Sequence, residues 1–153
     1  MILKEESGAS SWENPKPGLH QAVCVDIDDL GMQQTAYGEK HQLKLVFELD
    51  QQRSDGGPIR MGRKYTATLN EKGALRGDLK SWRGADLTVE EKNEFNLEKL
   101  VGAQAQLNIE EFQKQDGTAG TAIGAILPPA DGQNLEPSGD YVRAKDRKEE
   151  DPF

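Results

Sequence analysis

Five stretches of the chain alternate apolar and polar residues, which is the pattern of β-strands that bury one face. The most regular stretch places Leu or Phe at every second position from Leu43 to Leu49, with Lys44 and Glu48 among the residues between them. Turn-forming runs such as DQQRSDGGP separate the stretches. The predicted strands cover residues 19–28, 41–49, 64–69, 103–109 and 119–127.

The first predicted strand carries both aliphatic residues and acids. Strict alternation assigns the aliphatic side chains to the core and their neighbours to water. The inward set is Val23, Val25 and Ile27, and the outward set is Cys24, Asp26 and Asp28. Together with Asp29, these acids could hold a hard cation, but the other ligands of a calcium loop are missing, so the sequence favours a solvated strand end.

A helical region separates the third and fourth predicted strands. Leu75, Leu79 and Trp82 recur at the spacing of one helix face, so this face is predicted to pack on the core. Gly84 follows as a helix stop. Thr88-Val-Glu-Glu91 then has the spacing of a capping box, which predicts the start of a second helix.

Three strands, a helical insert and two strands follow the order of the OB-fold, a mainly β, partly open five-stranded Greek-key barrel. An open five-stranded sheet backed by helices has the same order, and both architectures remain open at this stage. The predicted domain covers residues 19–129. Residues 1–18, rich in Gly, Ser and Pro, are predicted to be a flexible leader, and residues 130–153, which lose all periodicity, a disordered acidic tail.

The 153-residue chain is acidic as a whole, with a formal charge of −8. Its single cysteine, Cys24, rules out an internal disulfide, and no apolar run approaches the roughly 20 residues that cross a bilayer. The first residues lack the basic region and apolar run of a secretory signal. These features predict a cytoplasmic protein without a membrane partner.

The middle of the chain reverses the sign of the charge. From Arg53 to Arg83 there are eight cations and three acids, a local charge of +5. Salt screens charge beyond a Debye length of roughly 8–10 Å, so a basic face inside an acidic protein can still bind phosphates. The cations are Arg53, Arg60, Arg63, Lys64, Lys72, Arg76, Lys80 and Arg83.

Motifs of catalysis are missing from the sequence. There is no Gly-rich phosphate loop and no nucleophile elbow. One cysteine and two histidines, His20 and His41, cannot form a structural zinc site of the usual type. The sequence therefore predicts neither an enzyme nor a cofactor or metal site.

Binding of single-stranded nucleic acid is better supported by the residue types. Such proteins need cations for the phosphates and exposed aromatic rings on which bases stack. An OB-fold presents them on its second and third strands and on the loops after strands one and four. The candidate contacts are Tyr37, Lys40, His41, Lys44, Arg53, Arg60, Arg63, Lys64, Tyr65, Phe112 and Lys114.

The aromatic candidates have alternative interpretations. Tyr65 alternates with Ala67 and Leu69, so it either packs in the core or contacts a base, and Phe112 presents the same choice. Tyr37 lies in a polar loop and is the better stacking candidate. A lone cation is usually solvated surface, so the cluster of cations is the signal.

The last five residues form an acidic run that ends in Pro-Phe: Glu149, Glu150, Asp151, Pro152 and Phe153. This peptide resembles the C-terminal tip of bacterial single-stranded DNA-binding proteins, without the usual residue between the acids and the proline. The resemblance implies docking of replication or repair proteins on the tip. The acidic tail is also expected to compete with DNA for the basic face, so that removal of residues 130–153 would tighten DNA binding.

Several motifs between residues 17 and 129 resemble phage-type single-stranded DNA-binding proteins. They are Tyr37-Gly38-Glu39-Lys40, Lys64-Tyr65-Thr66-Ala67-Thr68-Leu69, Ser81-Trp82-Arg83-Gly84, Phe95-Asn96-Leu97 and Leu100-Val101-Gly102. The resemblance implies an OB-fold and sequence-tolerant binding of single strands in phage replication, recombination or repair. The alternative is a protein-interaction module, such as a recombination mediator or a virion assembly factor, that does not bind nucleic acid. A homo-oligomer remains open.

Overall fold

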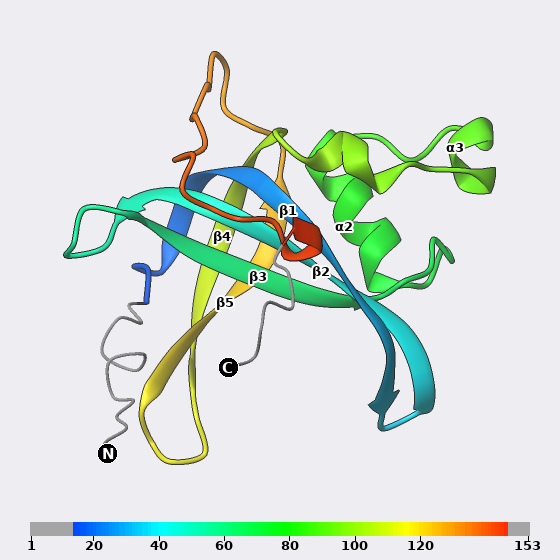
Figure 1. The fold of residues 1–153 in the computed structure, drawn as a ribbon, viewed down its shortest axis with the longest axis horizontal. Helices are drawn as coiled ribbons and strands as arrows, with labels where there is room; N and C mark the ends of the chain where they lie inside the picture. Colours follow the sequence, from blue (N-terminus) through cyan, green and yellow to red (C-terminus); the bar gives the residue numbers. More distant parts are fainter. Residues whose placement is uncertain (1–13, 147–153) are drawn as a thin grey trace.

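The structure is a computed structural model and describes residues 14–146 (Figure 1). Its elements are β1 (Gly18–Thr35), β2 (Gly38–Gln52), β3 (Pro58–Thr66), α2 (Ala74–Arg83), α3 (Val89–Asn93), the 3-10 helix η1 (Leu97–Leu100), β4 (Gln104–Gln113), β5 (Ala119–Leu127) and the 3-10 helix η2 (Ala144–Asp146). The five predicted strands and the helical insert between the third and fourth are therefore confirmed.

The strands form one antiparallel sheet in the order β3-β2-β1-β4-β5. β1 is the central strand, because its first residues pair with β4 while most of its length pairs with β2. β3 and β5 end the hydrogen-bonded order, and they also contact each other. The mainly β prediction is thus correct.

The core lies between the sheet and α2. Leu75, Leu79 and Trp82 are the buried residues of α2, as their spacing predicted. The Trp82 ring lies 5.5 Å from that of Phe47, and its indole N–H donates to the Gln104 carbonyl at 2.8 Å. Buried aromatic rings in such contact stabilise a core beyond their buried area.

Both ends of the helical insert follow the sequence signals. Gly84 adopts a left-handed conformation with φ of 83° and ends α2. The capping box of Thr88 and Glu91 is present at the start of α3. Glu91 also pairs with Arg83, and this contact lowers the pKa of the Glu91 carboxyl to about 2. The insert is therefore tied together by local interactions.

The facing of β1 differs from the prediction. Cys24 points into the main core, where burial raises the pKa of its thiol to about 12. Val23 and Val25 form a second buried cluster on the opposite face. A register shift between Cys24 and Asp26 re-aims the strand, so that Ile27 returns to the main core.

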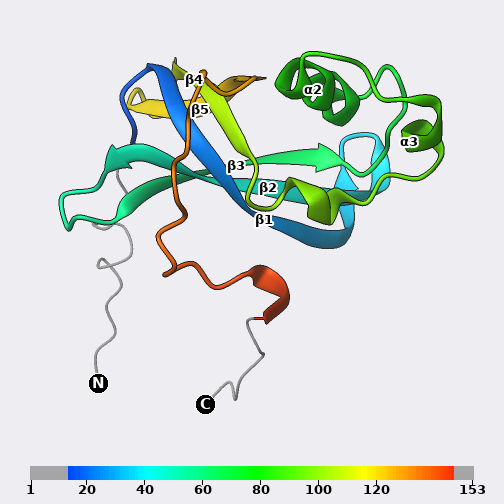
Figure 2. The same cartoon turned by 90° about the horizontal axis from the view of Figure 1, so that it is seen from above.

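The face of β1, β2 and β3 that points away from α2, called the outer face below, is partly covered by residues 130–146. Figure 2 shows α2 on one side of the sheet and this C-terminal segment on the other. Leu135 and Tyr141 pack against the second cluster, which consists of Val23, Val25 and Val46. The sequence predicted disorder over 130–153, whereas residues 130–146 follow a defined path.

The predicted leader is described from Asn14 onward. The Lys16 backbone N–H donates to the Gln51 side chain at 2.8 Å, and the Thr121 hydroxyl is 3.1 Å from the Asn14 side-chain oxygen. Residues 14–17 are thus joined to the sheet. The remainder of the leader and the predicted docking peptide, residues 149–153, lie outside the described residues.

Candidate nucleic-acid interface

The outer face divides into two halves, which the strand register defines. The covered half lies beneath the C-terminal segment and consists of Val23, Val25, Asp26, Val46, Glu48 and Arg60. The open half lies toward the β1–β2 hairpin and consists of Asp28, Lys40, Gln42, Lys44, Lys64 and Thr66. Both halves carry charged side chains. Those of the covered half make hydrogen bonds and ion pairs, whereas the lysines of the open half make no ion pair within residues 14–146.

Asp26 is the main anchor of the covered half and has no solvent exposure. Its carboxylate accepts hydrogen bonds from the Tyr141 hydroxyl (2.9 Å), from Arg143 Nε (2.9 Å) and from the Ala144 backbone N–H (2.8 Å). Burial raises the pKa of Asp26, but these hydrogen bonds outweigh it and hold the pKa below its usual range. Arg143 also makes two hydrogen bonds to Glu98 in η1, so one guanidinium joins three parts of the chain.

Glu48 is the second anchor, and it is 2% exposed. Its carboxylate accepts the Ser138 backbone N–H at 2.7 Å, the Ser138 hydroxyl at 2.9 Å and Arg60 Nε at 2.9 Å. The Arg60 guanidinium carbon lies 5.2 Å from the centre of the Tyr141 ring. The guanidinium of Arg60, a predicted nucleic-acid contact, is therefore already engaged with Glu48 and Tyr141.

Gln133 fixes the start of the C-terminal segment. Its amide donates to the Ala105 carbonyl at 2.9 Å and to the Gln104 side chain at 3.0 Å. Gln104 in turn exchanges two hydrogen bonds with the Leu135 backbone, each 2.8 Å long. Backbone groups of an irregular segment need such partners when they are taken out of water.

All six arginines within residues 14–146 lie in ion pairs with acids of the same chain. The positive charge of the 53–83 segment is thus largely neutralised, and Arg53, Arg60 and Arg63 are not free cations. The pairs are Arg53–Asp55 (3.1 Å), Arg60–Glu48 (2.9 Å), Arg63–Asp78 (3.1 Å), Arg76–Asp86 (3.0 Å), Arg83–Glu91 (2.6 Å) and Arg143–Asp26 (2.9 Å).

Tyr65 belongs to the core. It is 3% exposed, and its hydroxyl donates to Asp78 at 2.5 Å. Burial and then the Asp78 carboxylate raise the pKa of Tyr65, which keeps the phenol neutral. The Arg63 guanidinium lies 5.6 Å from the ring centre. Of the two interpretations that the sequence allowed, core packing is the correct one.

The open half contains the lysines Lys40, Lys44 and Lys64, none of which makes an ion pair with another residue of the 14–146 range. Lys44 and Lys64 stand directly opposite each other on β2 and β3. Like charges in this position repel, so the arrangement favours an anionic ligand. Asp28 flanks Lys44 on the β1 side and opposes that attraction.

The β1–β2 hairpin extends beyond the open half. At its tip Tyr37 is 88% exposed, and the turn is completed by Gly38 with φ of 98°. His41 is exposed but bonded to Asp29 at 2.6 Å. This hydrogen bond is the main reason why the pKa of Asp29 is lowered. Tyr37 is thus available for stacking, while His41 already has a partner.

The β4–β5 hairpin carries the remaining candidates. Phe112 is 48% exposed, and Lys114 is exposed at the start of the turn. Figure 1 shows both hairpins projecting toward the same side of the molecule, the lower side of that view. The structure therefore presents an aromatic residue near the end of each hairpin.

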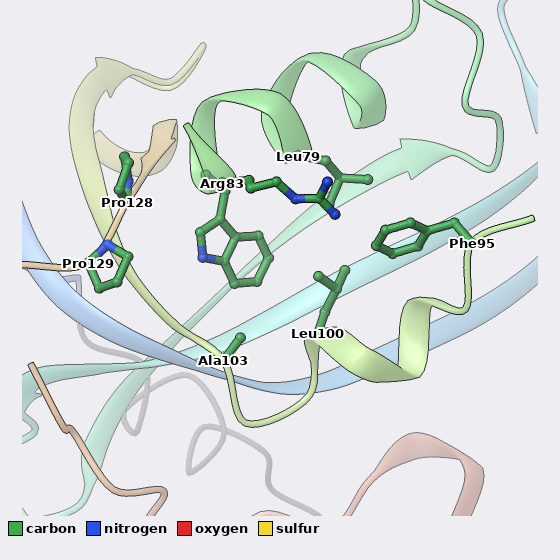
Figure 3. A pocket seen from close by; sticks show the side chains of 8 residues that line it. Leu79, Arg83, Phe95, Leu100, Ala103, Pro128 and Pro129 are labelled. Atoms are coloured by element: carbon green, nitrogen blue, oxygen red, sulfur yellow. The ribbon is translucent and has the colours of Figure 1, made fainter. Parts of the chain in front are cut away.

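A separate apolar pocket of about 280 Å³ lies between α2, the residues before β4 and the end of β5. Leu79, Phe95 and Leu100 point toward it, and the Arg83 side chain extends along its edge (Figure 3). Because Arg83 is paired with Glu91, the pocket rim offers little free positive charge. None of the predicted nucleic-acid contacts lines it.

Three features of the interface were missed in the sequence. Asp26 and Glu48 were assigned to solvent, although they anchor the C-terminal segment, and Asp28 was not recognised as a neighbour of Lys44. The apolar residues Leu135 and Tyr141, in an otherwise polar stretch, were the available signal that this segment packs on the sheet.

Other kinds of site are not apparent in the described part of the chain. No group of three His, Cys, Asp or Glu side chains within residues 14–146 is placed to hold a metal ion. The helices in this range are too short and too polar to cross a bilayer. In comparisons with known proteins, the chain matches neither a protein-family model nor a curated protein.

Proposed function

We propose that the chain is a single-stranded DNA-binding protein whose sheet is a variant of the OB-fold. The antiparallel order β3-β2-β1-β4-β5, the helix between β3 and β4 and the contact between the two edge strands support the fold assignment. The motifs that resemble phage-type single-stranded DNA-binding proteins point in the same direction.

The observation that carries the proposal is the open half of the outer face. Its lysines lack acidic partners within residues 14–146, whereas every arginine there is paired. The proposed path of the strand crosses Lys44 and Lys64 and runs between the two hairpins, where Tyr37 and Phe112 stack on bases. Phosphate contacts position the strand, and stacking accepts every base.

In the proposed context, the protein acts in phage replication, recombination or repair in the cytoplasm of a bacterial host. Binding, rather than catalysis, is its activity. The acidic Pro-Phe peptide at residues 149–153 recruits replication or repair proteins. This role rests on the resemblance of the peptide, because these residues lie outside the described part.

Fluorescence anisotropy of labelled oligo-dT and of a matching duplex, titrated across a salt series, tests the proposal. Four lysines (Lys40, Lys44, Lys64 and Lys114) predict a slope of log K against log salt of about −3, since each phosphate contact on a single strand contributes about −0.7. The Lys44→Gln/Lys64→Gln variant should lower the slope by about 1.4 and leave the melting temperature unchanged. Lys80→Gln, an exposed lysine on α2, is the control and should leave the slope unchanged.

The rival function is a protein-interaction module. It is favoured by the acidity of the chain and by the ion pairs of the six described arginines, which leave few free cations. Failure to bind oligo-dT even at low salt would overturn the DNA-binding proposal and leave this module. Equal affinity for duplex and single strand would instead show non-specific attraction to phosphates.

A further inference from the structure

Gly120 in β5 is a glycine for reasons of space. It pairs with Phe112 across the β4–β5 hairpin and is buried although the strand is at the surface. A Cβ at this position would lie 2.8 Å from Phe112 Cζ and 2.9 Å from Lys114 Cε. The backbone of Gly120 does not require positive φ, so another residue would fit the strand but not the space above it.

The ring of Phe112 and the stem of Lys114 thus converge on the backbone of one residue. Phe112 keeps about half of its surface exposed, although part of its ring packs against β5. A ring that is held in this way loses little conformational freedom when a ligand binds. An exposed aromatic ring with a cation beside it has the two features that bind a base and its phosphate.

We infer that Gly120 is a positioning residue for a base platform, which Phe112 forms and Lys114 flanks. The platform takes one unpaired base, because part of the ring already packs against β5 and about half of its surface stays exposed. This inference rests on the proposed function and deepens it. It names the residue that decides whether the second hairpin contributes to binding.

Side chains also lie along other glycines of the sheet, and Gly62 and Gly124 supply a comparison and a control. A Cβ on Gly62 would lie 3.0 Å from Lys44 Cε, so the Lys44 stem also lies along a glycine. A Cβ on Gly124 would lie 2.3 Å from Glu110 Cδ. Gly124→Ala therefore crowds β5 as Gly120→Ala does, but it displaces an acid instead of the platform.

The test compares oligo-dT with an oligonucleotide of the same length whose sugars carry no bases. Stacking of one base contributes enough that Phe112→Leu should weaken oligo-dT binding roughly 5- to 100-fold. Gly120→Ala should weaken it about three- to tenfold by tilting the ring, and Gly124→Ala should leave it unchanged. None of these variants should change the affinity for the abasic strand by more than about twofold, because its phosphates are the same and the flexible Lys114 side chain can rotate away from a new Cβ at Gly120.

A double-mutant cycle decides whether Gly120 acts through Phe112. In the Phe112→Leu background, Gly120→Ala should have no further effect on oligo-dT binding. The α-protons of Gly120 should also show an upfield NMR shift in the free protein, and Phe112→Leu should abolish it. Thermal melting verifies that each variant is folded, and Phe112→Leu alone tests the platform if Gly120→Ala does not fold.

The possible failures are distinguishable. If Phe112→Leu weakens binding but Gly120→Ala does not, the role of Gly120 is wrong. If Phe112→Leu has no effect while the native chain binds oligo-dT with a steep salt dependence, the platform is wrong and the proposed function stands. If the native chain does not bind oligo-dT, the proposed function and the platform fall together.

Discussion

The two halves of the outer face lie on the same three strands but use their charges in opposite ways. In the covered half, Asp26 and Glu48 are buried, and the C-terminal segment supplies most of their hydrogen-bond donors. In the open half, Lys44 and Lys64 face each other without acids paired to them within residues 14–146. The first arrangement stabilises the fold, and the second leaves charge for a ligand.

The contrast changes what the C-terminal segment can do. If residues 130–146 left the sheet, they would expose a patch of valines together with Asp26, Glu48 and Arg60, a surface with a net charge of −1 that does not attract DNA. The surface that residues 130–146 cover is therefore not a basic DNA-binding face. Any competition between the acidic tail and DNA belongs to residues beyond Asp146 and to the open half.

The largest effect is expected from truncation. A variant that ends at Pro129 removes most of the hydrogen-bond donors to Asp26 and Glu48 and exposes Val23, Val25 and Val46 to water. Exposure costs about 1.5–3 kcal/mol for each fully buried aliphatic side chain, against a typical total stability of about 5–15 kcal/mol. This variant should fail to fold, as judged by circular dichroism and urea unfolding. A variant that ends at Asp146 should unfold like the full chain and bind oligo-dT as tightly or more tightly.

The contrary outcome is well defined. A folded protein ending at Pro129 that binds oligo-dT more tightly than the full chain would show that residues 130–146 mask a DNA-binding face. The sequence led to that expectation for residues 130–153 as a whole. In the structure, residues 130–146 are part of the fold, so the expected competition with DNA applies only to residues 147–153, which lie outside the described part.

The next largest effect is the loss of stability when one acid is neutralised, and it should differ between the two halves. Asp26→Asn removes the charge that binds Arg143 and replaces one of the two acceptor oxygens by an NH₂ group that faces donors. The variant should lose about 3–5 kcal/mol of unfolding free energy. Asp28→Asn, two residues along the strand in the open half, should change stability by less than about 0.5 kcal/mol. Equal losses in urea unfolding would refute the division of the face.

The Asp26 anchor also predicts a pH dependence. Its pKa in the folded protein is below the unfolded value of about 3.9, so its contribution is fully present above that pH and is lost as the pH falls through the folded pKa. Stability should therefore decrease below about pH 4 in the native chain. Asp26→Asn should decrease less over the same range, because the titrating group is gone. Parallel curves for the two proteins would contradict the assignment.

The sequence predicted well what depends on local periodicity. The apolar alternation of β2 and the Leu75-Leu79-Trp82 face of α2 are periodic patterns within short stretches of sequence, and the structure confirms both. The predicted facing of β1 was wrong at Val23, Cys24 and Val25 but correct at Ile27. Alternation cannot choose between two buried faces, and a bulge at Val25 shifts the register.

Contacts between distant residues were the part that local patterns could not provide. Tyr141 and Asp26 are separated by 115 positions, so neither residue revealed the other in the sequence. The arginines were misjudged for a different reason: five of the six described arginines pair with acids only 2 to 15 positions away, but composition does not show which cation meets which acid. The 53–83 segment is therefore rich in cations, as predicted, but ion pairs neutralise its arginines in the folded protein.

The smallest predicted effect is a change in DNA affinity when one acid of the open half is neutralised. Asp28 stands beside Lys44 in the register, where its carboxylate repels an approaching phosphate. Two unit charges about 4 Å apart interact by about 1 kcal/mol in water, so Asp28→Asn should tighten oligo-dT binding about two- to fivefold at low salt. The gain should vanish at about 1 M salt, where the Debye length falls to about 3 Å. Glu90→Gln, which makes the same charge change on α3, is the control. An equal gain from both variants would attribute the effect to net charge and would remove the open half as the binding face.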